Sequence, residues 1–416
     1  MGTGCHHFDD GSCRSCPLLG VPYEAQLARK DAEVQAILRA VAGDIVWLPP
    51  VASPQFGFRN KAKMVVSGTA AASVLGLPPP QPTDLTDCPL YPAVIRAAFG
   101  PIKQFISEVN LLPYDLSPSQ KRVTPTKAAG RGELKNVVVT AAPSGELLVQ
   151  FVLRSRADEA RIRSKLPILL AALPNLKVVS LNIHPEHKAV LAGAQEIVLT
   201  EQRSLKFDLG DFSLYVGPQS FFQTNTYIAS LLYAAAAEWL SEVPARTIWD
   251  LYCGIGGFAL AVSGEGREVT GVEISADAIR NAKRAKVDQD SFLALRDPAL
   301  PVVSRRVCDA PQPTVPQDDG RLVSFLVGDA TAFANAGSEL PDIVIVNPPR
   351  RGLGNELVQL LNYSGVPTIL YSSCNPKTLT SDIQGMSNYR IAKAQDFDMF
   401  PNTNHCEVLT LLRRIH

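Results

Sequence analysis

Hydrophobic positions along the chain change their spacing twice. Residues 24–42 carry apolar side chains at helical spacing, which predicts an amphipathic helix near the start. From about residue 46, short apolar runs are separated by Gly and Pro, which predicts strands at 62–68, 135–142, 146–155, 177–183 and 205–217. We expect this middle region to form an antiparallel-rich α+β domain.

From residue 224, apolar runs alternate with helical segments. Helices are expected at 225–242 and 276–286, and strands at 247–253, 268–274, 323–329, 342–349 and 368–374. Such alternation predicts a mainly parallel, doubly wound sheet. The last two apolar runs, YRIAKAQ and CEVLTLL, are close enough in the sequence to form a hairpin at the edge of that sheet.

The chain therefore reads as an α/β protein in three parts. They are an N-terminal cysteine segment with its helix (1–45), a central α+β domain (46–213) and a C-terminal Rossmann-like sheet (214–416). Residues 287–321 are rich in proline and have no period, so we interpret them as an exposed insertion. Cys308, inside this insertion, is expected to be a bystander.

Composition adds limits to this picture. The 416 residues include 40 basic and 40 acidic side chains, so the chain is not basic overall, although a local basic face would suffice for RNA. No apolar stretch is long enough to span a membrane, and the polar first residues lack the apolar core of a signal peptide. We expect a cytoplasmic protein, a monomer, with no membrane or DNA partner.

The segment WDLYCGIGGF (249–258) ends a predicted strand and opens a helix, and its glycines let the backbone approach a ligand closely. Glu273 ends the next strand, where a carboxylate can bond both hydroxyls of a ribose. These features fit NAD as well as S-adenosylmethionine. Asp329 and the NPPR sequence (347–350) end later strands at the same expected rim, which favours S-adenosylmethionine.

Cys374 lies at the end of another predicted strand, in YSSCNP. Carbon 5 of uracil is a poor nucleophile, but a thiolate added to carbon 6 converts the ring to an enolate that attacks a methyl donor. A base must then remove the carbon-5 proton. Glu407, on the last strand, is the candidate base, since a shielded carboxylate has a raised pKa. An isolated cysteine is more often a small buried apolar residue.

Three cysteines near the start, Cys5, Cys13 and Cys16, have the spacing C-x7-C-x2-C, and Cys88 lies far downstream. Four thiolates can hold zinc or an iron–sulfur cluster. The irregular spacing and the proline after Cys88 favour the cluster, whereas His6 and His7 leave a mixed zinc site open.

Two segments are expected to contact RNA phosphates. GFRNKAK (57–63) has three basic residues and no acid, and KRVTPTKAAGRGELK (121–135) has five basic residues and one Glu. Solvated surface loops with no ligand can have the same composition.

Taken together, the motifs resemble the bacterial RNA (uracil-5-)-methyltransferases that carry an iron–sulfur cluster. The resemblance covers nearly the whole chain and rests on C-x7-C-x2-C, FRNKAKMVVSG, CPLYP, RGELK, QSFFQTN, DLYCGIGGF, NPPRRG, YSSCN and HCEVLTLL. The most similar branch methylates the uridine at position 747 of 23S ribosomal RNA. The insertion at 287–321 and the length of 115–130 depart from the family pattern, and both bear on RNA specificity.

The resemblance implies roles for individual residues. It implies a 4Fe-4S cluster on Cys5, Cys13, Cys16 and Cys88, and S-adenosylmethionine contacts from Gln223, Tyr252, Glu273 and Asn347. It implies Cys374 as nucleophile and Glu407 as base, acting on a uridine flipped out of the 23S ribosomal RNA.

Two other functions stay open. The first is the same chemistry on a transfer RNA uridine. The second is amino-methylation of adenine or cytosine, for which N-P-P is also typical. That reaction needs an aromatic residue after the prolines and no cysteine, whereas this chain has Arg350 there and also has Cys374.

Overall fold

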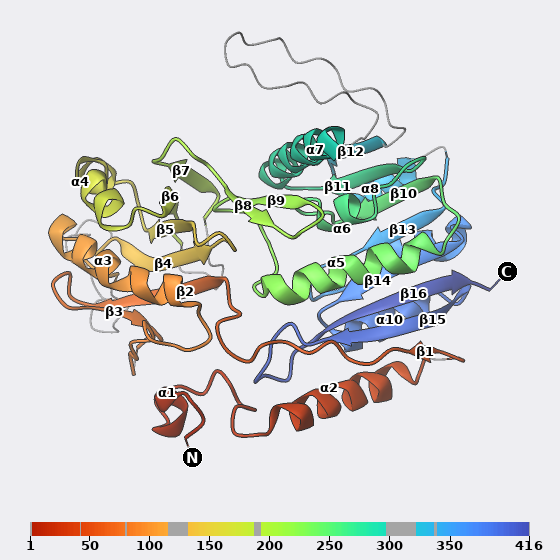
Figure 1. Ribbon diagram of the computed structural model, residues 1–416, viewed down its shortest axis with the longest axis horizontal. Coiled ribbons are helices and arrows are strands. Elements are labelled where there is room, and N and C mark those ends of the chain that lie inside the picture. Colours follow the sequence, from red (N-terminus) through yellow and green to blue (C-terminus); the bar gives the residue numbers. More distant parts are fainter. Residues whose placement is uncertain are drawn as a thin grey trace, which may run out of the picture.

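The computed structural model describes residues 2–41, 43–79, 81–114, 132–186, 193–296, 322–336 and 339–415. It contains an eight-stranded sheet and a six-stranded sheet, which lie side by side with a two-stranded hairpin between them (Figure 1). The N-terminal segment runs beneath both sheets in that view.

The larger sheet carries the predicted parallel arrangement. Its order is β1 (Val46–Trp47), β15 (Tyr389–Phe397), β16 (Glu407–Arg414), β14 (Thr368–Ser373), β13 (Ile343–Val346), β10 (Thr247–Leu251), β11 (Glu268–Glu273) and β12 (Leu322–Val327). Only β16 is antiparallel to its neighbours. The carboxyl ends of β10 to β14 therefore share one rim with the first residue of β16.

Helices cover both faces of this sheet. They are α5 (Thr226–Ser241), α6 (Gly257–Ala261), α7 (Ala276–Arg296), α8 (Ala330–Ala336), α9 (Asn355–Ser364) and α10 (Pro376–Gly385). One core gathers around Trp239, Phe258 and Phe325, and the core on the other face includes Leu357 and Leu379. The prediction that the helix from residue 276 ends at 286 is wrong, because α7 continues to Arg296. The rest of the predicted insertion, 297–321, lies outside the described residues.

The smaller sheet is antiparallel-rich, as predicted. Its order is β3 (Ser73–Gly76), β2 (Lys61–Gly68), β4 (Leu134–Ala141), β5 (Leu147–Leu153), β6 (Leu176–Ile183) and β7 (Gln195–Val198). Only β5 and β6 are parallel, and α4 (Glu159–Ala172) makes the crossover between them. This helix and α3 (Ala93–Val109) supply residues to a core of their own, separate from the cores of the large sheet.

The ends of the predicted central domain pack with the large sheet. Strand β1 pairs with β15, so the β15–β16 hairpin is not the outermost pair of that sheet. The hairpin of β8 (Leu205–Asp208) and β9 (Ser213–Val216) contributes Phe207 and Leu214 to the core around Trp239. A run that reads as one strand over 205–217 is thus two strands around a turn.

The N-terminal segment contains α1 (His6–Asp9) and α2 (Tyr23–Leu38). Helix α2 ends four residues before the predicted limit of 42, and it buries Val34 and Leu38 in the core that also holds Leu379 of α10. Among the described residues, no helix is long and apolar enough to cross a bilayer.

Phe325 of β12 lies over two glycines of the neighbouring structure. A Cβ atom at Gly271 in β11 would lie 2.6 Å from Phe325 Cδ1, and one at Gly256 would lie 2.7 Å from Phe325 Cζ. Gly256 also has a φ of +89°, which favours glycine. The ring thus holds the glycine turn close to β11.

We expect Gly271→Ala to lower the free energy of unfolding by about 1–3 kcal/mol, because the added methyl group overpacks a buried contact. Urea denaturation measures this loss. Gly264→Ala is the matched control, since the nearest atom to its Cβ is Arg267 Cδ at 3.8 Å. Equal stability of the two variants would contradict the packing interpretation.

Candidate active site

Cys374 and Glu407 lie next to each other on the rim of the large sheet. Cys374 directly follows β14, and Glu407 is the first residue of β16, which pairs with β14 with Ser373 opposite Val408. Two residues predicted from separate motifs are therefore brought to one place by the antiparallel pairing of these strands.

The thiol of Cys374 is half-buried and faces a guanidinium. Burial raises its pKa, and the nearby Glu407 carboxylate raises it further. Arg350, through its charge and a hydrogen bond, acts in the opposite direction. Arg350 itself is held through its backbone, since its carbonyl accepts a hydrogen bond from Asn375 Nδ2 at 3.1 Å. The cation thus favours the thiolate that nucleophilic attack requires.

Glu407 is only 1% exposed and accepts hydrogen bonds from two neighbouring strands. Asn347 Nδ2, just after β13, donates to Oε1 at 2.9 Å, and the Ser372 hydroxyl of β14 donates to the same oxygen. Burial raises the pKa of Glu407 to about 7, although both hydrogen bonds lower it. A carboxyl group with this pKa can accept and release a proton near neutral pH.

The glycine turn and Glu273 form a second part of the rim. Gly254 N donates to Glu273 Oε2 at 3.3 Å, and Ser275 N donates to Oε1 at 2.9 Å. Tyr252, with a φ of +65°, begins the turn. An ionised carboxylate has about four acceptor positions. Glu273 therefore keeps acceptor capacity for a ligand beside the turn.

Gln223 and Asp329 are two further residues that the sequence placed in the cofactor site. Gln223 is buried in the loop between β9 and α5, where its carbonyl accepts from Asn60 Nδ2 at 2.9 Å. Asp329 is exposed, and its carboxylate accepts from Ala332 N at 2.9 Å in the first turn of α8. Burial raises the pKa of the Tyr252 phenol, and the nearby charge of Asp329 raises it further. Asp329 is thereby placed at the rim beside Tyr252.

A buried acid inside the turn motif was not singled out from the sequence. Asp250 of β10 is fully buried, and Ala259 N of α6 donates to its Oδ2 at 2.9 Å, whereas its Oδ1 has no hydrogen-bond partner. Burial raises the pKa of Asp250 to about 8. The signal in the sequence was one acid within the apolar run TIWDL.

The four cysteines that were predicted to hold a metal group line one cavity of about 200 Å³. Cys5, Cys13 and Cys16 come from the segment around α1, and Cys88 comes from the loop before α3. Asp87 connects these two regions, because its carboxylate is hydrogen-bonded to His6 Nε2 and to His7 Nε2, each at 2.7 Å. In the part of the chain that the structure describes, no three of the four sulfur atoms lie within 4.8 Å of one another.

A second group of possible metal ligands lies in the same segment. Ligand atoms of His6, His7 and Asp87 all lie within 4.8 Å of one another. His7 also lines the cavity of the four cysteines, so these histidines lie where the sequence left a mixed zinc site open.

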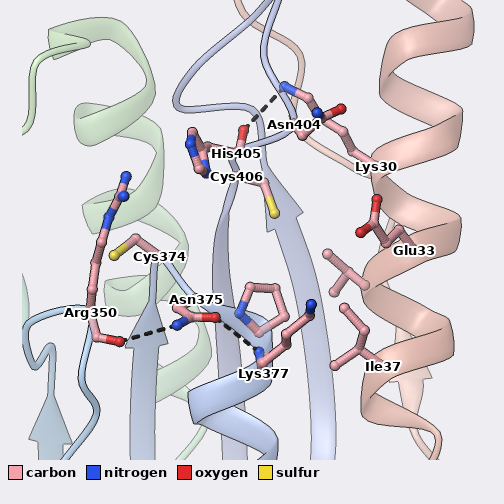
Figure 2. A pocket seen from close by; sticks show the side chains of 12 residues that line it. Lys30, Glu33, Ile37, Arg350, Cys374, Asn375, Lys377, Asn404, His405 and Cys406 are labelled. Carbon is pink, nitrogen blue, oxygen red and sulfur yellow. Dashed lines mark hydrogen bonds between the residues drawn. The ribbon is translucent and has the colours of Figure 1, made fainter.

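A cavity of about 290 Å³ opens beside Cys374. Figure 2 shows Cys374 and Arg350 on one side, His405 and Cys406 above them, and Lys30, Glu33 and Ile37 of α2 on the opposite side. The N-terminal helix is therefore one wall of the cavity that contains the nucleophile candidate.

A second cavity, of about 450 Å³, lies between the two sheets. Lys61 and Lys63 of β2 line it together with Phe221 and with Ser275, which is bonded to Glu273. Burial lowers the pKa of Lys61 to about 8, and Phe221 is 71% exposed. Of the second basic segment, residues 121–131 lie outside the described residues.

Comparison with known proteins relates this arrangement to a family. The model of the tRNA (uracil-5-)-methyltransferase family matches residues 338–415. The 23S rRNA (uracil(747)-C(5))-methyltransferase RlmC of Shewanella amazonensis is 42% identical over 417 residues, which cover 98% of this chain and 97% of that protein. RlmC of Escherichia coli O157:H7 is 41% identical over 411 residues, or 98% and 99% of the two chains.

A solved structure shares the fold. The tRNA (uracil-54, C5)-methyltransferase of Pyrococcus abyssi, in complex with S-adenosyl-L-homocysteine, has a TM-score of 0.70 and 24% identity. The match covers 95% of this chain and 85% of that one. Because the bacterial relatives match at 41–42% identity over nearly their whole length, the chain belongs to the RNA (uracil-5-)-methyltransferase family.

Proposed function

We propose that the protein transfers a methyl group from S-adenosylmethionine to carbon 5 of uridine 747 in 23S ribosomal RNA. The observation that carries this proposal is the placement of the Cys374 thiol near the buried Glu407 carboxyl group at one rim of the sheet. The full-length similarity to RlmC proteins supports the choice of this uridine.

Cys374 is the proposed nucleophile. Its thiolate adds to carbon 6 of the uracil, and the electron pair of the 5,6 double bond moves into the ring carbonyl as an enolate. Arg350 stabilises the thiolate before attack. S-adenosylmethionine, when bound, supplies the methyl group that carbon 5 then takes.

Glu407 completes the reaction. Its ionised form takes the proton from carbon 5, the 5,6 double bond re-forms, and Cys374 leaves as thiolate. Asn347 and Ser372 fix the position of the carboxylate through their hydrogen bonds to Oε1. Glu407 acts only after methylation, so its loss blocks release of the product.

Four residues are proposed to hold S-adenosylmethionine. Glu273 fits the two ribose hydroxyls, because its carboxylate lies at the end of β11 beside the glycine turn. Tyr252, Gln223 and Asn347 surround the same part of the rim, as the family resemblance implies. For Asn347, the Nδ2 group is already bonded to Glu407, which leaves its oxygen for the ligand.

We propose a 4Fe-4S cluster on Cys5, Cys13, Cys16 and Cys88. The four cysteines line one cavity, and the family resemblance implies a cluster at this place. With four thiolate ligands the cluster would have no iron atom open to a substrate. Its role would be structural, as a cross-link between the N-terminal segment and the loop that contains Cys88.

RNA is proposed to enter along the cavity between the sheets. Lys61 and Lys63 offer positive charge for phosphates, and the exposed ring of Phe221 offers a face for a base. A target uridine must leave its stack to reach Cys374. The same chemistry on transfer RNA is the second candidate, since an RNA of either kind satisfies these contacts.

The main test is covalent trapping with 5-fluorouridine RNA. Fluorine at carbon 5 cannot be removed as a proton, so the wild-type protein with S-adenosylmethionine should form an adduct with a 23S hairpin on a denaturing gel. Cys374→Ala should form none, whereas Cys308→Ala, which removes a thiol outside every motif, should form it normally. An adduct only with transfer RNA would change the substrate, and no adduct with any uridine RNA would overturn the covalent mechanism.

Glu407→Gln should form the adduct with ordinary uridine RNA and release it slowly, because the amide cannot take the carbon-5 proton. In the wild type, product release should increase as pH rises through about 7, since the raised pKa leaves Glu407 protonated and inactive at lower pH. Rapid-quench measurements of adduct and product across pH test both points. Normal turnover by Glu407→Gln would assign the base to another group.

Anaerobically purified protein should contain iron and acid-labile sulfide in equal amounts and absorb broadly in the visible range. Cys88→Ser should lose most of both, and Cys253→Ala should keep them. Zinc in place of iron in the wild type would restore the zinc interpretation.

A further inference from the structure

The strand that carries Glu407 is preceded by a loop, residues 398–406, which we call the base loop. It connects β15 to β16 and lies against α2. His405 and Cys406, at its end, line the cavity that contains Cys374 (Figure 2). The path of this loop sets where Glu407 enters the rim.

Lys30 of α2 donates three hydrogen bonds to the base loop. Its Nζ donates to Asp398 Oδ1 at 2.6 Å, to the Phe400 carbonyl at 3.0 Å and to the His405 carbonyl at 3.1 Å. The three donors of the ammonium group are thereby all used. Two of these acceptors lie in the first three residues of the loop and the third lies in its second-last residue, so one side chain connects both ends of the loop.

The Lys30 contact is buried. Lys30 is 3% exposed and Asp398 is 0% exposed, and the second carboxylate oxygen of Asp398 accepts from Tyr23 Oη at 2.8 Å. A buried charge needs such partners, because removing one of them leaves the other uncompensated. A lysine on an exposed helix face would only be solvated.

Gln26, one turn before Lys30, binds the centre of the same loop. Asn402 N donates to Gln26 Oε1 at 3.0 Å, and Gln26 Nε2 donates to Asn402 Oδ1 at 3.3 Å. Asn402 is fully buried with a φ of +66°, a conformation in which asparagine is tolerated. Leu18, two residues after Cys16, donates its N–H to the Asn402 carbonyl at 3.0 Å. The N-terminal segment thus contacts the base loop both from α2 and from the residues just after Cys16.

We propose that Lys30 is a positioning residue for proton abstraction, acting through the base loop on Glu407. The inference rests on the proposed function. Lys30 bonds the carbonyl of His405, two residues before Glu407, so loss of these bonds shifts the carboxylate relative to carbon 5 of the bound uracil. The three hydrogen bonds of Lys30 all go to the base loop, whereas Cys374 follows β14, so the first covalent step should be preserved.

The test compares Lys30→Met with Arg29→Met, a control at the exposed neighbouring position of the same helix. Lys30→Met should lower kcat roughly 10–100-fold, as small displacements of a catalytic group do, with KM for RNA nearly unchanged. The covalent adduct with ordinary uridine RNA should accumulate, as in Glu407→Gln. Arg29→Met should turn over like the wild type.

Gln26→Met provides a milder second variant, because it removes the Asn402 bonds and leaves the buried charge pair intact. It should show the same accumulation of adduct to a smaller extent, even if Lys30→Met does not fold. Normal kcat with only a lowered Tm in both variants would overturn the inference and give Lys30 a purely structural role. Failure of the wild type to methylate the RNA would instead count against the proposed function.

Discussion

The burial of the Glu407 carboxyl group is the constraint around which the rim of the large sheet is built. A carboxylate removed from water requires donors, and here they come from Asn347 after β13 and Ser372 in β14. These bonds tie three neighbouring strand ends together. They also leave the pKa at about 7, because two hydrogen bonds only partly offset complete burial. The same group therefore organises the site and gains a pKa suited to proton transfer.

The topology explains why a residue at the start of one strand meets a residue at the end of another. The parallel strands β10 to β14 deliver the glycine turn, Glu273, Asn347 and Cys374 to one rim. Only an antiparallel neighbour can bring its first residue there, and β16 is that neighbour. If β16 were parallel to its neighbours, Glu407 would lie at the other end of the strands, away from Cys374.

The N-terminal segment is part of this site and not an appendage to it. Strand β1 extends the sheet beside β15, and α2 packs into the same core as α10. Lys30 of α2 donates hydrogen bonds to the loop before Glu407. The cysteine cavity lies in the same segment, fastened to the central domain by Asp87. The N-terminal segment and the large sheet therefore line the cavity beside Cys374 together.

The sequence by itself determined most helices and strands, because periods of two and 3.6 residues are local properties of the chain. It also determined that Cys374, Glu273 and Asn347 end strands, since each lies where an apolar run stops. Only the tertiary structure decided that β1 joins the sheet and that α7 reaches Arg296, because a two-residue strand has no period and the helix has no strong stop signal. It alone decided the burial of Lys30, whose partner Asp398 lies near the other end of the chain. The energy of burying a charge depends on its partner, and no local pattern specifies a partner hundreds of residues away.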